Sequence, residues 1–186
     1  MVKKLVREDL ESFEDFEPGK VERNGLAYTQ TQEFIEAELT RYLKMYRDLQ
    51  QVDQTARLIR DQIDGLLRRY HDYVIQGKIQ AHYRQVGITS KKGNVFEHVI
   101  PARTVRNLLI AGRLTLEQAL NSPTCLITNE ANQILVDRKL NKRTPSVWWF
   151  WRRYEGLGIE LETFDGQPVD VRVWDLARHY EYFREI

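Results

Sequence analysis

An acidic residue followed directly by a histidine, Glu97-His98, stands where an apolar segment runs into Pro101. A second apolar segment, residues 124–128, leads straight into a run of helical composition that carries Asn132, whose amide is another group able to bind a metal ion. An acid and a histidine at the end of one strand, followed by a strand that leads into such a helix, form a workable layout for cutting phosphodiester bonds. Neither half of the layout would indicate this chemistry without the other.

The elements around these residues must bring them together. The pattern predicts a strand, two helices, a strand and a helix, over residues 95–100, 105–111, 115–120, 124–128 and 129–140. The second of the helices has Thr115 as its N-cap and Gln118 three residues later, as in a capping box. This order of elements places the end of the first strand beside the start of the last helix, where Glu97, His98 and Asn132 are expected to converge.

Residues 94–161 resemble the HNH, or ββα-metal, nuclease family, and in particular a compact branch of it. In that branch an E/D-H-V-V/I-P motif is separated by helices from an apolar strand and an ITKEE-H-like helix. Here the motif reads EHVIP at 97–101, and the strand and helix read CLITNEANQIL at 125–135. The segment WRRYEGLGIEL at 151–161 is similar to one that follows the helix in that branch.

The resemblance implies a ββα-metal-like domain that hydrolyses DNA, with RNA as the alternative substrate. His98 is implied as the general base, because a neutral imidazole with a pKa near 6.5 can take a proton from water, and the pH profile should rise through that pKa. Glu97 and Asn132 are implied as ligands of one Mg²⁺ or Mn²⁺ ion, since both ions prefer hard oxygen ligands. Asn132 stands where the signature has histidine, and the middle asparagine of the motif is either Asn129 or Asn121.

Positive charge is concentrated in the part of the chain that holds this candidate site. Residues 78–153 contain thirteen Lys or Arg against four acids, although the whole chain has a net charge of only +1. This is the electrostatic footprint of a polyanion binder, and a solvated basic face is the alternative interpretation. Arg103 and Lys139 are expected to add positive charge near the site. The residues expected to bind nucleic acid are Lys91, Lys92, Arg138, Lys142, Arg143, Arg152 and Arg153.

The N-terminal half has a different character. Residues 1–30 are expected to form an acidic, partly irregular arm, whereas residues 31–77 carry apolar side chains at near-heptad spacing. That spacing predicts either one helix of roughly 65 Å, at 1.5 Å per residue, or two helices that fold back near residues 50–53. Because the apolar stripe is narrow, it requires a partner helix, which favours a coiled-coil homodimer or another homo-oligomer through residues 31–77.

The complete chain is therefore predicted to be an α+β, helix-rich protein whose residues 78–186 form the ββα-metal-like domain, with a Trp-rich C-terminal segment. No apolar run is long enough to span a bilayer and the start lacks a signal-like apolar core, so a cytoplasmic protein is expected. His71 is predicted to lie on a solvated face, and Trp148–Trp151 to pack in the core with one exposed ring. The alternatives to a nuclease are a non-catalytic nucleic-acid-binding or assembly protein that retains the fold, and a helical scaffold.

Overall fold

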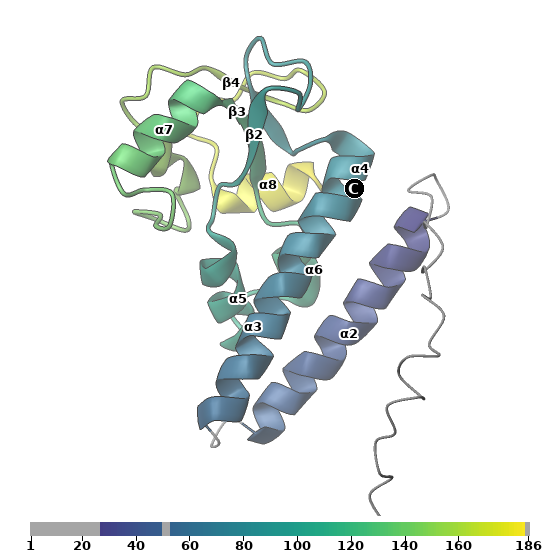
Figure 1. Ribbon diagram of the computed structural model, residues 1–186. Helices are drawn as coiled ribbons and strands as arrows, with labels where there is room; N and C mark the ends of the chain where they lie inside the picture. Colours follow the sequence, from purple (N-terminus) through teal and green to yellow (C-terminus); the bar gives the residue numbers. More distant parts are fainter. Residues whose placement is uncertain (1–26, 50–52, 185–186) are drawn as a thin grey trace, which may run out of the picture.

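The structure, a computed structural model, describes residues 27–49 and 53–184 (Figure 1). It has an α+β, helix-rich architecture, in which a small four-stranded sheet is accompanied by two long helices and several short ones. The predicted acidic arm, residues 1–30, lies outside the described residues except for the first turn of a helix. No helix in the described part of the chain is long and apolar enough to cross a membrane.

The N-terminal helical region consists of two helices that lie side by side, α2 (Ala27–Leu49) and α3 (Asp53–Tyr70) (Figure 1). The two helices contact one another, which corresponds to the hairpin among the two arrangements that the heptad pattern allowed. The apolar stripe is buried within the chain, since Leu39 of α2 and Ile63 of α3 are both 0% exposed and belong to one core cluster. The hairpin thus supplies the partner helix that the narrow stripe requires.

The C-terminal end of α3 continues into a π-helical turn, His71–Ile75, and then into the short helix α4 (Gln76–Ile79). A π-turn inserts an extra residue into each helical turn and so changes the direction in which the following side chains point. His71, the first residue of this segment, is buried, and its ring centroid lies 4.9 Å from that of His98 in the sheet.

The sheet has the strand order β2-β3-β1-β4, so that β2 is an edge strand. The pairs β2–β3 and β1–β4 are antiparallel and the pair β1–β3 is parallel. In the register of the first pair, His98 at the end of β2 lies opposite Thr124 at the start of β3. The strands are β1 (Tyr83–Gln85), β2 (Asn94–His98), β3 (Thr124–Thr128) and β4 (Leu161–Thr163).

Two helices, α5 (Ala102–Ile110) and α6 (Leu116–Leu120), connect β2 to β3, and α7 (Asn129–Asp137) begins directly after β3. The predicted capping box at the start of α6 is present, with Gln118 N–H donating to Thr115 Oγ1. Helix α7 packs against both β2 and β3. The predicted order of strand, two helices, strand and helix is therefore confirmed for this part of the chain.

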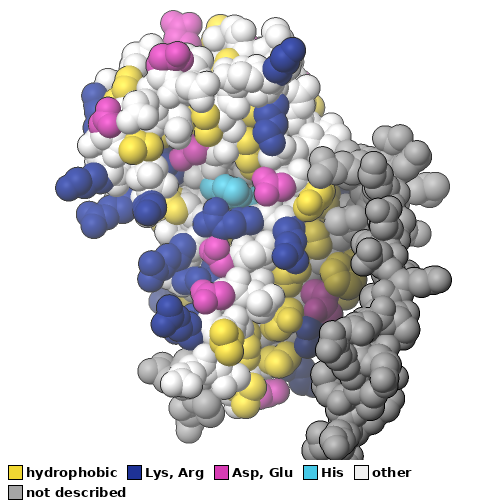
Figure 2. Space-filling view, in the orientation of Figure 1, with side chains coloured by type: hydrophobic (Ala, Val, Ile, Leu, Met, Phe, Trp, Pro, Cys, Tyr) yellow, Lys and Arg dark blue, Asp and Glu magenta, His cyan; other side chains and the backbone are white. Residues whose placement is uncertain are grey.

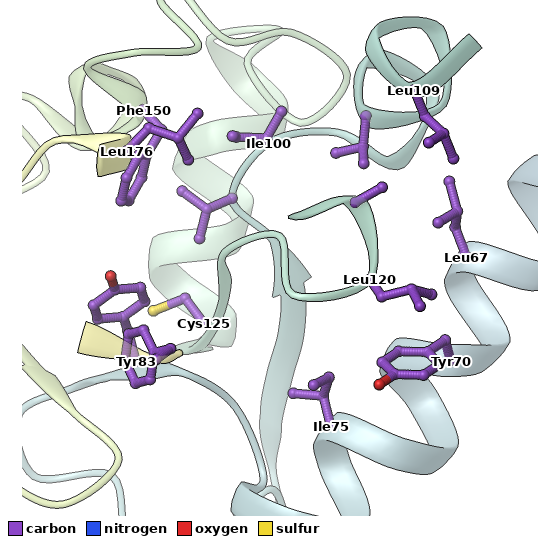
Figure 3. Close-up of a cluster of buried hydrophobic side chains, with 14 of the residues drawn as sticks. Leu67, Tyr70, Ile75, Tyr83, Ile100, Leu109, Leu120, Cys125, Phe150 and Leu176 are labelled. Carbon is purple, nitrogen blue, oxygen red and sulfur yellow. The ribbon is translucent and has the colours of Figure 1, made fainter. Parts of the chain in front are cut away.

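A single core cluster extends from α2 through the sheet to α8 (Leu176–Tyr182), and Figure 3 shows part of it around Tyr83 and Cys125. The 3₁₀ turn Phe150–Tyr154 contributes Phe150 and Trp151 to it, while Trp148 is 51% exposed, as the aromatic run predicted. Some polar atoms within the core are paired with one another. Trp174 Nε1–H donates to Tyr83 Oη at 2.8 Å, and the Tyr83 hydroxyl lies 2.8 Å from Nδ1 of the buried His179.

Replacing Leu39 by alanine should lower the free energy of unfolding by about 2–5 kcal/mol, because a fully buried leucine leaves a cavity between α2 and α3. Phe34→Ala on the same helix is the matched control, since Phe34 is 62% exposed and its loss should change stability by less than about 0.5 kcal/mol. Urea unfolding followed by circular dichroism measures both. Equal effects of the two substitutions would show that α2 does not pack on α3 in this way.

Candidate functional site

A pocket of about 410 Å³ lies at the outer edge of β2. It contains all three residues that the sequence placed at the site, Glu97, His98 and Asn132, together with the predicted supporting residue Arg103. The remaining lining residues are Arg68, Val95, Phe96, Pro101, Ala102, Asn141 and Lys142. The end of the first strand and the start of the last helix therefore do come together, as predicted. The pocket is also lined by Arg68 and Asn141, which the sequence did not indicate.

The position of β2 at the sheet edge explains how neighbouring residues reach one pocket. Successive side chains of a strand point to opposite faces, so Glu97 and His98 leave β2 in opposite directions. Glu97 meets the turn that carries Arg153 and Tyr154, whereas His98 meets His71. Since no further strand covers the edge of β2, both faces open into the same hollow.

Glu97 is held by two buried side chains. Arg153 Nη2–H donates to one carboxylate oxygen and Tyr154 Oη–H donates to the other. Arg153, which is 0% exposed, also donates from Nη1 to His98 O at 2.9 Å and from Nη2 to Leu140 O at 2.8 Å. Burial raises the pKa of Glu97, while the Arg153 charge and the Tyr154 hydrogen bond oppose that change.

The position of Arg153 corrects the prediction that it binds nucleic acid at the surface. Its guanidinium is fully enclosed and is occupied by Glu97 and by backbone carbonyl groups, so it cannot reach a phosphate outside. Arg152, its neighbour in the 3₁₀ turn, is exposed. Two adjacent arginines thus have opposite environments, which the packing of the turn sets.

His98 lies between two aromatic rings. Its ring centroid is 5.7 Å from that of Phe96 and 4.9 Å from that of His71, and its Nε2 is buried with no hydrogen-bond partner. Burial lowers the pKa of His98 to about 2, and the positive potential of His71, Arg68 and Arg153 acts in the same direction. His98 is therefore neutral throughout the physiological pH range, and the expected titration near pH 6.5 is corrected.

His71 is the residue near the site that the sequence interpretation misplaced. It was predicted on a solvated face, yet it is 0% exposed. Its Nε2 lies 2.8 Å from Leu120 O, and because a carbonyl oxygen only accepts, this nitrogen carries the hydrogen. Burial lowers the pKa of His71 to about 4. A signal was present in the sequence, because His71 follows Leu67 by four residues and precedes Val74 by three, which is the spacing of the apolar stripe.

The other predicted nucleic-acid-binding residues are exposed, and of these Lys142 lines the pocket. Lys91 donates to Gln76 Oε1 at 2.6 Å, and Arg138 donates to the backbone carbonyls of Glu155 and Gly156. Exposed residues without a place in the pocket are Lys91, Lys92, Arg138, Lys139, Arg143 and Arg152. Asn129 also lies outside the pocket, and its side chain donates to Gly93 O at 2.9 Å, which fixes the loop before β2 to the start of α7.

The surface around the pocket is basic. Figure 2 shows histidine atoms reaching the surface near the centre of one face, with an Asp or Glu side chain beside them and Lys and Arg side chains below them. Of the four histidines, His71, His82 and His179 are each 0% exposed, whereas His98 lines the pocket. The single carboxylate that lines the pocket, that of Glu97, is paired with Arg153, and Arg68 is paired with Asp64, so the charges of Arg103 and Lys142 are left to attract an anion.

The donor atoms of the pocket are of the type that a hard divalent cation prefers. They are the Glu97 carboxylate and the amide oxygens of Asn132 and Asn141. Each Glu97 oxygen already accepts one hydrogen bond, but a carboxylate oxygen has two lone pairs and keeps one for a metal ion. Among the described residues no three His, Cys, Asp or Glu side chains gather into a metal-binding group. A Mg²⁺ or Mn²⁺ ion held by these three groups would need water or substrate to complete its coordination.

Comparisons of the chain with models of protein families, with curated proteins and with solved structures found no match. Function must therefore be inferred from the pocket itself. Its distinguishing features are a neutral histidine, a carboxylate of fixed orientation, two amide groups and three cations.

Removing one partner of the Glu97–Arg153 ion pair should destabilise the folded protein. Arg153→Met leaves a buried carboxylate without its counter-charge and should reduce the free energy of unfolding by about 3–5 kcal/mol. Adding Glu97→Gln to that variant removes the uncompensated charge, so the double variant should be more stable than Arg153→Met. Urea unfolding of the two single variants and the double variant gives the coupling free energy. Strictly additive effects would show that the two side chains do not interact.

The four histidines of the chain predict loss of stability in acid. All have a folded-state pKa below the ordinary value, chiefly because burial disfavours the charged imidazolium. Below pH 6.5 the unfolded chain therefore binds more protons than the folded chain, and stability falls as the pH falls. At pH 5.5 the four groups together should lower the free energy of unfolding by about 5.5 kcal/mol relative to pH 7.5, from roughly 1.4 kcal/mol for each. Melting temperatures at these two pH values provide the measurement, and equal values would contradict the burial of the histidines.

Proposed function

We propose that this chain is a metal-dependent endonuclease of the ββα-metal type, which hydrolyses phosphodiester bonds in DNA with His98 as the general base. The observation that carries the proposal is that Glu97, His98 and Asn132 line one pocket, although more than thirty residues separate Asn132 from the other two. The antiparallel strands β2 and β3, followed directly by α7 packed on both, support the ββα assignment.

His98 is suited to accept a proton because it is neutral before substrate binds. Its Nε2 is buried, which leaves Nδ1 as the nitrogen that can meet a water molecule in the pocket. A pKa of about 2 makes His98 a weak base in the free protein. A phosphodiester anion bound beside it favours the charged imidazolium and so raises that pKa. We infer that His98 becomes an effective base only with a phosphate in place.

The other pocket residues position the substrate. Arg68, Arg103 and Lys142 attract the phosphate, and Arg153 and Tyr154 fix the direction of the Glu97 carboxylate. Glu97 and Asn132, with Asn141 beside them, would hold one Mg²⁺ or Mn²⁺ ion. When bound, such an ion neutralises phosphate charge and stabilises the departing oxygen. The chain thus provides the base on one face of β2 and the ligands on the other.

His98→Ala should lower the rate of plasmid nicking by at least about a hundredfold, the usual scale for loss of a general base. Asn132→Ala should lower the affinity for Mg²⁺, because it removes a ligand. Raising the Mg²⁺ concentration should therefore restore part of the nicking activity. Gln133→Ala, an exposed residue of the same helix turn, is the matched control and should behave as wild type. Asn132 is a cleaner probe than Glu97, since Glu97 also neutralises the buried Arg153.

The measurement is relaxation of supercoiled plasmid with Mg²⁺, Mn²⁺ or EDTA, over a range of pH. At DNA concentrations well below saturation the profile should have no inflection near pH 6.5 from His98, because the rate then reports the free protein, in which the pKa of His98 is far lower. Nicking that survives in His98→Ala would exclude His98 as the base. The same assay on RNA identifies the preferred nucleic acid.

A second candidate is a non-catalytic nucleic-acid-binding or assembly protein that retains the fold. The observations that favour it are the weak basicity of His98 and the engagement of both Glu97 oxygens by Arg153 and Tyr154. Salt-dependent DNA binding by a wild-type protein that nicks no plasmid with either metal would select this candidate.

Self-association of the chain and its location in the cell are further parts of the proposed function. If residues 31–77 also self-associate, the exposed apolar side chains Phe34 and Leu58 are available for the contact, since the stripe itself is covered. Sedimentation of the whole chain reports its oligomeric state. A cytoplasmic location accords with Cys125, a buried free thiol.

A further inference from the structure

A second hollow, of about 470 Å³, adjoins the pocket at His98. Its walls come from α3 and α5, and Arg68 and Arg103 line both hollows, so that one continues into the other. We call it the arginine groove after the five arginines that line it, Arg57, Arg60, Arg68, Arg103 and Arg106. Figure 2 shows Lys and Arg side chains that continue below the surface histidine along this face of the molecule.

The arginine groove has an excess of positive charge. Its lining includes two acids, Asp61 and Asp64, against the five arginines, and Asp64 pairs with Arg68 at 2.8 Å. Arg106 is only 7% exposed, yet its guanidinium donates to the neutral Asn107 Oδ1, and within the described residues it forms no ion pair. Packing of α5 against α3 therefore brings together like charges that a bound anion would stabilise.

The dimensions of the groove fit a nucleic-acid strand. Arg57 and Arg68 are eleven residues apart on one helix, which corresponds to about 16 Å at 1.5 Å per residue. Phosphates of one strand are spaced by about 3.4 Å along the duplex axis, so this length matches about five nucleotides. The groove leads to the pocket that contains His98, where the scissile phosphate is proposed to lie.

We propose that the arginine groove binds the phosphate backbone of the DNA strand on one side of the bond that is cut. The inference rests on the proposed function for its choice of DNA. It assigns α3, a helix from the part of the chain that the heptad pattern gave to self-association, to the nucleic-acid interface. Phosphate contacts of this kind position a strand without reading its sequence.

The test uses the full chain with Arg57→Gln and Arg60→Gln combined, because neither residue lines the pocket at His98. The matched control is Lys44→Gln with Arg47→Gln, which removes the same charge from exposed positions on α2. Helix α2 lies on the opposite side of α3 from α5 (Figure 1). Fluorescence anisotropy of a labelled DNA duplex is measured between about 50 and 200 mM salt.

The groove variant should bind DNA more weakly at low salt. The logarithm of the association constant falls as the logarithm of the salt concentration rises, and the steepness of this fall should decrease by about 1.8, from roughly 0.9 for each lost phosphate contact. The control should keep the wild-type slope. If the double variant loses stability by circular dichroism, Arg57→Gln alone, at an exposed position, should decrease the slope by about 0.9.

An unchanged slope in the groove variant, or an equal change in the control, would overturn the proposal. Binding of polyglutamate in place of DNA would also overturn it, since the groove would then serve an acidic protein. The two proposals fail separately. If nicking depends on His98 but the salt slope of the groove variant is unchanged, only the proposed role of the groove is wrong. If the slope is reduced but the wild-type protein nicks no DNA, only the proposed hydrolysis is wrong.

Discussion

The arrangement of the site depends on one buried guanidinium, that of Arg153. It is fully enclosed and donates to the Glu97 carboxylate, to the backbone carbonyls of His98 and Val99, and to Leu140 O. A buried charge is tolerated only when its counter-charge and its hydrogen bonds are provided. The end of β2, the loop after α7 and the 3₁₀ turn are consequently fixed relative to one another, because each contributes an acceptor to the same group.

The same charge influences the chemistry of the pocket. Arg153 keeps Glu97 oriented, and together with Arg68 and His71 it opposes protonation of His98. The resulting pocket is positively charged and contains a neutral histidine, which suits it to bind an anion first and to accept a proton afterwards. In the proposed function, binding of the anion and the basicity of His98 are thus linked through electrostatics.

The sequence predicted those features that depend on local patterns. Apolar segments and caps located β2, β3, α6 and α7, and their order was sufficient to bring Glu97, His98 and Asn132 together. Strands β1 and β4 have three residues each, too few for a periodic signal, so the complete sheet was not predictable. Tertiary packing decided the rest. It buried Arg153 but not Arg152, and it placed α5 against α3 to form the arginine groove.

The hydrogen bonds of Tyr83 have a consequence for folding during synthesis of the chain. Its hydroxyl contacts Trp174 and His179, which follow it by 91 and 96 residues. A ribosome that has released β1, β2 and β3 has still to synthesise the partners of the residue at the centre of the sheet. Contacts so distant along the chain form late and slow the search for the native state. The centre of the sheet, to which β3 and through it β2 are joined, therefore reaches its final set of contacts only after helix α8 has been synthesised.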